Sequence, residues 1–215
     1  MNVLIENLDD LLHGFRLTLV LFLTSGLCSL VLGTVLAAMR VSPTPPLRAA
    51  GAGYVNVARN TPLVLVFVLV TFGLPTLDVR FSFFVFAVIA LSLYTSAFVC
   101  EALRSGINAV QSGQAEAARS IGMTFGQTLS VVVLPQAFRT VVPPLASIMI
   151  ALVKNTAVAE AFGVTEATYQ LDSLIRDNPD ALYPLFFGIA AGYILIALVV
   201  AGVARLIEAK VAIVR

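Results

Sequence analysis

Long runs of apolar residues dominate this sequence, and each run is long enough to cross a lipid bilayer as a helix. Nearly every side chain is apolar between residues 14 and 38, and similar runs follow at about residues 81–102 and 183–207. A spanning helix needs about 20 such residues to cross a ~30 Å hydrocarbon layer. Because every backbone polar group in that layer must be hydrogen-bonded, helices are the expected spanning structure. Outer-membrane barrel strands alternate over about ten residues, so the uninterrupted runs exclude a barrel.

The composition indicates the same class of protein. Hydrophobic residues make up 59% of the 215 residues, charged residues only 12%, and the mean hydropathy is +0.97. A soluble domain has roughly twice this charged fraction. The net charge of +1 gives no case for nucleic-acid binding. Cys28 and Cys100 lie inside apolar runs, so we expect buried small side chains and no disulfide. The acidic start of the chain, residues 1–10, does not resemble a cleavable signal peptide.

These runs predict an all-α membrane protein whose whole chain, residues 1–215, forms a single domain with a membrane core at about 12–210. Pro62 suits the first turn of the second spanning helix, and Pro143 or Pro144 suits that of the fourth. The polar residues 163–182 predict a partly helical external loop. The five expected spans are about 13–39, 54–74, 81–102, 143–162 and 183–207.

Lysine and arginine are enriched in cytoplasmic loops, and they therefore assign an orientation to these spans. Nine basic residues of the loops and chain ends fall on one side of the membrane and two on the other. The N-terminus is therefore expected outside the cell and the C-terminus inside. The larger set comprises Arg40, Arg48, Arg59, Arg104, Arg119, Arg139, Arg205, Lys210 and Arg215, and the smaller set comprises Arg80 and Arg176.

A polar segment at residues 112–135 interrupts the apolar second half of the chain on the predicted cytoplasmic side. It predicts a short helix at about 113–123, with Ala115, Ala118 and Ile121 on an apolar face and Gly122 as its stop. Such a helix is too short to span a bilayer and would be marginal alone in water. We therefore expect another surface to press against it. The alternative from periodicity is an ordinary cytoplasmic loop with one helical turn.

The spacing of Glu116-Ala117-Ala118, Gly122 and Leu134-Pro135 resembles the EAA loop of permease subunits in ABC-type importers. The flanking residues 101–107 and 134–137 are similar to the polar amino-acid branch of that family, and the resemblance covers the whole chain. It implies that the short helix is a coupling helix that docks on a separate ATPase. The coupling residues that it implies are Gly113, Gln114, Glu116, Ala117, Ala118, Arg119 and Gly122.

Lys154 falls near the middle of the fourth predicted span, about 15 Å along the helix from Pro144. A charge at that depth is costly, so it indicates a functional site such as a substrate path. Two other interpretations stay open: a side chain that snorkels to the interface, or an ion pair with Glu160 or Glu101. Glu101 also suits an ion pair with Arg104 one turn further along its helix.

Two further motifs resemble polar amino-acid permeases. Lys154-Asn155-Thr156 is similar to a Lys-Asp/Asn-Thr-Ser-Leu motif, with Ala157-Val158 in place of Ser-Leu. Residues 59–63 are similar to an Arg-Gly-Thr-Pro-Leu motif with asparagine at the glycine position. Asn155 and Glu160 offer groups for the ammonium of an amino acid, and Lys154 or Arg59 offers a cation for its carboxylate. The expected path residues are Asn60, Thr61, Lys154, Asn155, Thr156 and Glu160.

The chain has no pattern typical of an enzyme. His13 is its only histidine, which excludes an HExxH zinc site and a histidine-based triad. No G-x-x-x-x-G-K-[ST] loop is present, so we do not expect this chain to bind ATP in that manner. We expect no cofactor or metal on this chain, with ATP and Mg used by a partner ATPase.

The resemblance implies a multi-pass permease subunit of an ATP-driven importer for polar amino acids in the inner membrane of a bacterium. Its implied partners are ABC ATPase subunits, a second identical or homologous permease subunit and an extracytoplasmic binding protein. Residues 94–98, 104–108 and 154–158 are similar to actinobacterial glutamate-uptake permeases, so glutamate is the expected substrate, with arginine, glutamine and histidine still open. The rival functions are an ion-coupled secondary carrier or channel, and a membrane scaffold that transports nothing.

Overall fold

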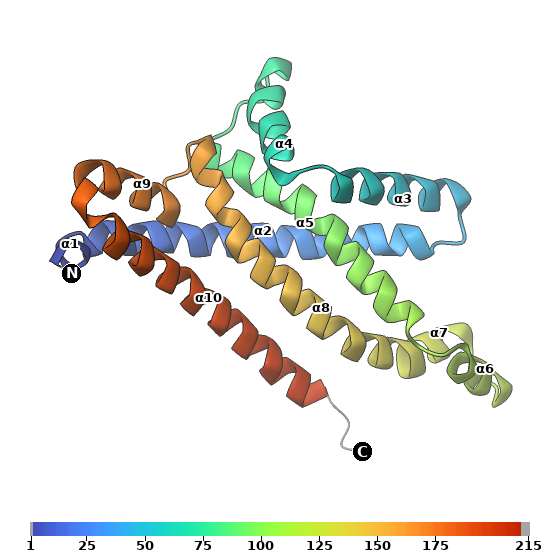
Figure 1. The fold of residues 1–215 in the computed structure, drawn as a ribbon. Helices are drawn as coiled ribbons and strands as arrows, with labels where there is room; N and C mark the ends of the chain where they lie inside the picture. Colours follow the sequence, from blue (N-terminus) through green and yellow to red (C-terminus); the bar gives the residue numbers. More distant parts are fainter. Residues whose placement is uncertain (1, 212–215) are drawn as a thin grey trace.

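The computed structural model describes residues 2–211, which form helices joined by short turns (Figure 1). Arg215, counted above on the cytoplasmic side, lies outside the described residues. The α-helices are α1 (Asn2–Glu6), α2 (Leu8–Val41), α3 (Pro45–Asn60), α4 (Leu63–Val68), α5 (Phe83–Asn108), α6 (Ser112–Ser120), α7 (Phe125–Gln127), α8 (Leu134–Asn155), α9 (Ala167–Asp177) and α10 (Leu182–Val211). The π-helical segments are η1 (Leu69–Gly73) and η3 (Thr128–Val133), and the 3-10 segments are η2 (Leu74–Leu77), η4 (Thr156–Phe162) and η5 (Pro179–Ala181).

Four helical runs among the described residues are long and apolar enough to cross a membrane: Leu8–Val41, Phe83–Asn108, Phe125–Phe162 and Pro179–Lys210. A bent pair, Pro45–Asn60 and Leu63–Leu77, makes a fifth crossing if it is taken as one broken span. The predicted all-α membrane fold is therefore confirmed. The first helix begins earlier than the predicted residue 13, because acidic residues in its first turn favour a helix N-terminus.

The second predicted span, at about 54–74, is not one straight helix. α3 ends at Asn60, and the helix that follows turns away by 110°. Pro62 explains the break, because its ring disfavours a helical conformation at the preceding residue, and Thr61 is extended with φ −97° and ψ 131°. Pro62 then forms the N-cap of α4 and so begins a new helix.

The fourth predicted span, at about 143–162, begins much earlier in the structure. One helical run extends from Phe125 to Phe162, so Pro143 and Pro144 lie inside it and not in its first turn. A membrane helix tolerates internal prolines when neighbouring groups satisfy the freed carbonyls. Pro135 accounts for the π-helical segment η3, because it has no N–H to donate to the carbonyl four residues before it.

Small residues allow α2 to pack closely against α5 and α8. A methyl group added at Gly33 would lie 2.5 Å from Val99 of α5, and one added at Gly26 would lie 3.7 Å from Met149 of α8. Ser29, on the same face of α2, is fully buried. These small residues of the first span therefore serve contact between helices.

The prediction of two buried cysteines is only half right, and the glycines of α10 also differ in their surroundings. Gly188 and Gly192 lie against side chains of α1 and α2, whereas a methyl group added at Gly202 would meet no atom of another helix within 4 Å among the described residues. Both cysteines are free, and Cys100 is buried, but Cys28 is exposed on the outer face of α2. An exposed small side chain on a spanning helix costs little, because the surrounding lipid is itself apolar.

The positions of charged residues distinguish the two ends of the bundle. The C-terminal ends of α2 and α5 meet at one end, where Arg40 and Arg104 share contacts to Glu101, and α6 lies beyond this end (Figure 1). α1, α9 and the start of α10 lie together at the opposite end (Figure 1). Because basic residues are enriched in cytoplasmic loops, we call the first the cytoplasmic end and the second the external end.

Candidate functional site

The helix α6 ends in a turn that only a residue such as glycine adopts easily. Gly122 has φ +89°, and its N–H donates to the carbonyl of Arg119 at 3.0 Å. The N–H of Met123 donates to the carbonyl of Ala118 at 3.2 Å, which completes a Schellman motif. The predicted stop at Gly122 is confirmed, although the helix covers Ser112–Ser120 and is shorter than the predicted 113–123.

One face of α6 rests on η3 and the other faces away from the bundle. Ala118 is the buried residue of the helix, at 5% exposure. The expected apolar face was only partly right, because Ala115 is half-buried and Ile121 is 80% exposed. The other predicted coupling residues are all exposed: Gly113, Gln114, Glu116, Ala117, Arg119 and Gly122. That these residues dock on an ATPase stays a prediction.

Two large apolar side chains beside α6 are exposed, and the sequence analysis did not predict their exposure. Ile121 is 80% exposed and Phe125 is 76% exposed, on either side of the Gly122 turn. Phe125 is held at the start of α7 by a capping box, in which Thr124 and Gln127 cap each other's backbone N–H. Exposed apolar groups at the end of a membrane bundle are typical of a surface that another protein covers.

Lys154 lies in the last turn of α8, just before the helix narrows into η4. It is exposed, and the negative end of the α8 dipole favours a cation there. Among the described residues no acidic group is in an ion pair with Lys154, so the alternative of a pair with Glu160 or Glu101 is not formed here. Phe162 ends the run eight residues later, so Lys154 lies about 12–16 Å inside that end at 1.5–2.0 Å per residue.

The other predicted residues near Lys154 differ in accessibility. Asn155 and Glu160 are half-exposed, so both are accessible from outside the bundle. Thr156 is fully buried, and its hydroxyl donates to the carbonyl of Val153 at 2.7 Å. The Thr156 hydroxyl is therefore not accessible in this conformation, and its place in a substrate path stays a prediction.

Asn60 and Thr61 lie at the break between α3 and α4. Each side chain returns to its own helix: the Asn60 amide donates to the Asn56 carbonyl at 2.7 Å, and the Thr61 hydroxyl donates to the Val57 carbonyl at 2.8 Å. Asn60 is exposed, and Thr61 borders a cavity of about 350 Å³. The break therefore leaves both residues accessible while satisfying their hydrogen bonds.

The two groups of predicted path residues, 60–61 and 154–160, lie on neighbouring elements of the structure. α4, which follows the break, packs on η4, where the rings of Phe67 and Phe162 stack with their centroids 4.9 Å apart. In the described part of the chain no hydrogen bond joins the polar side chains of residues 60–61 to those of residues 154–160. Their role in binding a substrate stays a prediction.

A stripe of accessible polar residues follows one face of α8 towards Lys154. Thr140, Ser147 and Lys154 recur every seven residues, which places them on one side of a helix, and all three are exposed. Polar groups are costly when they face lipid. The hydroxyls of Thr140 and Ser147 donate to the carbonyls of Ala137 and Pro143 in their own helix. Lys154 has no ion pair within the described residues, so it is the residue of the stripe that needs a polar cover.

Glu101 joins three helices at the cytoplasmic end. Its carboxylate contacts the guanidinium of Arg40 from α2, that of Arg104 at 2.9 Å and that of Arg59 from α3 at 3.8 Å. The predicted pair with Arg104 is confirmed. The other two partners come from distant parts of the sequence, and Arg59, which also stacks on Phe98 at 5.7 Å, is therefore not free to meet a substrate carboxylate in this conformation.

Glu166 joins three helices at the external end, a role that the sequence analysis did not predict. It is fully buried at the N-cap of α9, where it accepts hydrogen bonds from the N–H groups of Thr168 at 2.7 Å and Tyr169 at 3.3 Å. The hydroxyls of Thr18 from α2, at 3.0 Å, and Tyr193 from α10 also donate to it. Burial raises the pKa of this carboxyl above its ordinary value, although the hydrogen bonds oppose the shift.

A glycine on α2 makes this arrangement possible. A methyl group added at Gly14 would lie 2.7 Å from the side chain of Gln170 and 3.0 Å from the backbone of Ala167. The N–H of Ala167 donates to the Thr18 hydroxyl at 3.2 Å, so the start of α9 is bonded directly to α2. In the sequence, the position of Glu166 just before a helical segment indicates an N-cap, but it does not identify Thr18 and Tyr193 as partners.

Comparisons with known proteins agree on one family. Residues 29–213 match the family described as binding-protein-dependent transport system inner membrane component. The chain is 43% identical over 201 residues, 88% of each chain, to the glutamate transport system permease protein GluC of Corynebacterium efficiens. It is 36% identical over 197 residues to the probable glutamine ABC transporter permease protein GlnM of Bacillus subtilis, covering 92% of this chain and 91% of the relative. A crystal structure titled as an amino acid ABC transporter with histidines matches with a TM-score of 0.89 and 30% identity over 96% of each chain.

Proposed function

The chain belongs to the family of binding-protein-dependent transport system inner membrane components, and we propose that the amino acid it imports is glutamate. It is a multi-pass inner-membrane permease subunit of a polar amino-acid ABC importer, and the family is not catalytic. ATP is hydrolysed by a partner ATPase, and a binding protein delivers the substrate. We also take residues 1–215 as one transmembrane domain.

Lys154 is the observation that carries the choice of glutamate. Glutamate has two carboxylates and one ammonium at neutral pH, so a path for it needs a cation that is not already neutralised. Lys154 is exposed near mid-span and forms no ion pair among the described residues. Asn155 and Glu160, both accessible, offer acceptors for the ammonium. Relatives at 43% and 42% identity are named as glutamate permeases, which supports the same choice.

Uptake by the reconstituted importer tests the substrate. Proteoliposomes that contain the permease, its ATPase and its binding protein are supplied with ATP and labelled glutamate, glutamine, arginine or histidine. We expect glutamate uptake to exceed that of the others. Lys154→Gln should lower glutamate uptake about tenfold or more, as expected for loss of a charge-assisted contact of 1.5–3 kcal/mol. Arg205→Gln, which removes an exposed cation elsewhere, is the matched control. Glutamine uptake above glutamate uptake would contradict the proposal.

We further propose that α6 transmits ATPase motion through its exposed face. Gly122→Val should destroy the Schellman turn, because valine does not adopt φ +89° at low cost, whereas Gly122→Asn should retain it. The measurement is the ratio of amino acid imported to ATP hydrolysed. We expect a fall of tenfold or more for Gly122→Val and for a bulky substitution such as Glu116→Trp, with normal insertion. Unchanged ratios in both variants would contradict this role.

The polar stripe on α8 supports a second permease subunit as the cover that the chain lacks. Two copies that face each other through Thr140, Ser147 and Lys154 would enclose a polar passage between them. Ser147→Cys in a background without Cys28 and Cys100 should then form a disulfide between subunits in membranes. Leu198→Cys, on the outer face of α10, is the control and should not crosslink. A failure of Ser147→Cys to crosslink, or an equal yield from Leu198→Cys, would reject this arrangement.

An ion-coupled secondary carrier or channel is the remaining alternative. Such a protein would import the amino acid along an ion gradient without ATP. Uptake in proteoliposomes that contain a sodium or proton gradient but no ATP separates the two functions. We expect no uptake above background under that condition.

A further inference from the structure

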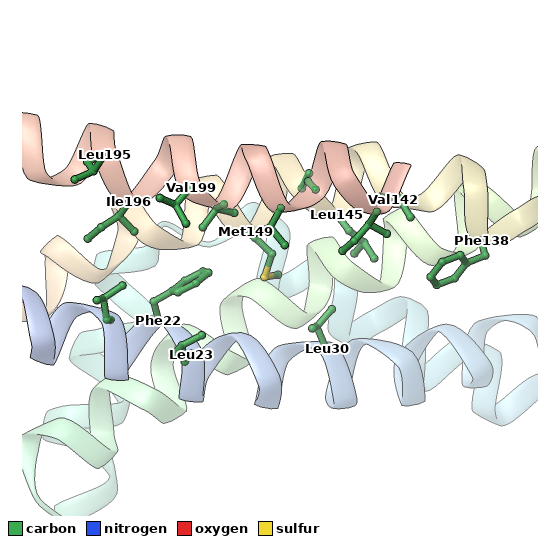
Figure 2. A pocket seen from close by; sticks show the side chains of 16 residues that line it. Phe22, Leu23, Leu30, Phe138, Val142, Leu145, Met149, Leu195, Ile196 and Val199 are labelled. Carbon is green, nitrogen blue, oxygen red and sulfur yellow. The ribbon is translucent and has the colours of Figure 1, made fainter. Parts of the chain in front are cut away.

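An apolar groove lies between α2, α8 and α10 on the side of the bundle shown in Figure 2. It encloses about 640 Å³, and all sixteen residues that line it are apolar. Phe22, Leu30, Met149 and Val199 project into it from the three helices (Figure 2). Nothing in the coupling helix or the proposed substrate path accounts for this groove.

The groove has the length of one leaflet of a bilayer. Its lining extends from Phe138 to Met149 on α8, which is eleven steps from residue to residue, and from Leu195 to Ile207 on α10, which is twelve steps. At 1.5 Å per residue these distances are about 16 and 18 Å. One half of a ~30 Å hydrocarbon layer is about 15 Å. An acyl chain of a single leaflet therefore matches the groove in length.

Two basic residues stand at the cytoplasmic end of the groove. Arg139 follows Phe138 and lies seven residues before Ala146, a lining residue on the same side of α8. Lys210 lies seven residues after Val203 on the lining side of α10 and is exposed.

The charges near these two cations leave room for an anion. Within the described residues neither Arg139 nor Lys210 is in an ion pair, and the Nε of Arg139 has no hydrogen-bond partner. Glu208 lies four residues after Ala204, a lining residue, so an acidic group also stands on this side of α10. A phosphate at this end would therefore meet two cations and one carboxylate, which leaves a net positive charge.

We propose that this groove binds one anionic phospholipid of the cytoplasmic leaflet, with an acyl chain along α8 and the phosphate between Arg139 and Lys210. An anionic lipid suits both parts of this surface, because its acyl chain covers the apolar lining while its phosphate meets the two cations. The polar stripe of Thr140, Ser147 and Lys154 lies on a different face of α8, so the lipid does not occupy the substrate path.

Lipid retention by the assembled importer tests this proposal. The purified complex in nanodiscs of equal phosphatidylglycerol and phosphatidylcholine is transferred to detergent, and the retained lipid is counted by native mass spectrometry. We expect about one phosphatidylglycerol for each permease chain and several-fold less phosphatidylcholine. Arg139→Gln with Lys210→Gln should reduce phosphatidylglycerol retention at least fivefold. Arg205→Gln, which removes a cation on the opposite side of α10, should leave it unchanged.

A second variant tests the groove itself. Ala146→Phe places a ring in the cavity and should reduce retention of both lipids, and Ala146→Leu does the same with less risk to folding. A normal size-exclusion profile shows that either variant is assembled. Equal retention of the two lipids by the wild type, or full retention by the variants, overturns the proposal. A disulfide between copies formed by Val199→Cys would also overturn it, because a second chain would then occupy the groove.

Discussion

Glu166 and Glu101 lie at opposite ends of the molecule and are stabilised in opposite ways. Glu166, at the external end, is fully buried and accepts hydrogen bonds from neutral hydroxyl and amide groups. Glu101, at the cytoplasmic end, is partly exposed and is surrounded by three guanidinium groups. Hydrogen bonds to neutral donors fix distance and direction, whereas ion pairs act over a longer range and depend on nearby charge.

This difference separates a fixed end from an adaptable one. Around Glu166, hydrogen bonds from α2, α9 and α10 converge on a single carboxylate, so displacing one helix leaves buried groups without partners. Around Glu101, an arginine that moves away leaves two others in contact, and water reaches the site. The adaptable end is the one beside α6, the helix that we propose to contact the partner ATPase.

The largest expected effect comes from removing the charge of Glu101. Glu101→Gln leaves three arginines close together without a counter-charge and should destabilise the protein by about 3 kcal/mol, near the low end for a broken buried ion pair. Unfolding is measured in a Cys28→Ser background with a thiol-reactive dye, which reports exposure of the buried Cys100. Glu208→Gln, a half-exposed acid without an ion pair among the described residues, is the control. A loss no greater than that of the control would contradict the role of Glu101.

Replacing Glu166 by an apolar side chain should have the next largest effect. Glu166→Leu leaves the hydroxyls of Thr18 and Tyr193 buried without their acceptor, and this should lower the free energy of unfolding by about 2 kcal/mol. Glu166→Gln should cost much less, because its carbonyl still accepts from the backbone of α9 and the hydroxyls can reorient. The same dye assay measures both. Equal losses would show that shape, and not hydrogen bonding, decides stability at this end.

The pH dependence of stability gives a smaller but sharper comparison. The pKa of Glu166, which lies outside the spanning segments, is raised by burial above its ordinary 4.5, so the folded protein binds a proton more tightly than the unfolded chain. Its contribution to stability is therefore full below pH 4.5 and is lost as the pH rises through the folded pKa.

Glu166→Gln cannot titrate and serves as the reference for this effect. The stability of Glu166→Gln relative to wild type should be greatest at about pH 8 and should fall as the pH is lowered towards about 5. Melting temperatures of the two proteins, measured side by side across this range, check the sign. A difference that does not change with pH would show that the buried carboxyl keeps an ordinary pKa.

The smallest expected effect belongs to Arg59. Its guanidinium lies 3.8 Å from Glu101 and its side chain is 45% exposed, so Arg59→Gln should cost only about 0.5 kcal/mol, as exposed ion pairs do. Arg40→Gln should cost more, because the Arg40 side chain is only 16% exposed. The dye assay, run at low and at high salt, compares the loss of unfolding free energy in the two variants. A larger loss for Arg59 than for Arg40 would reverse the ranking of partners around Glu101.

Much of the fold could be predicted because lipid imposes simple rules on a chain. Apolar length identified the membrane helices, and the positions of arginine and lysine agreed with the two ends of the bundle. Gly122 could be predicted as a helix stop because the Schellman turn depends on local residues only. Proline was ambiguous: Pro62 follows the end of a helix, whereas Pro143 and Pro144 lie inside one, and a mainly apolar run follows the proline in both cases.

The groups that join helices could not be predicted in the same way. Thr18 and Glu166 are 148 residues apart in the sequence, and no local pattern connects them. The pair of Glu101 with Arg104 was predictable because one helical turn separates them, whereas Arg40 reaches Glu101 only through packing of α2 on α5. Thr156 was assigned to a path by its motif, and its burial depends on how η4 packs.

The break at Pro62 has a consequence for how the chain is made. Residues Leu63–Leu77 follow the break, and 15 residues rise only about 22 Å at 1.5 Å each, less than the ~30 Å layer. The four long runs can each enter the bilayer on their own apolar length, but this segment is held in place by contacts with α5 and η4, which are synthesised after it. The final position of this segment therefore depends on helices that follow it in the chain.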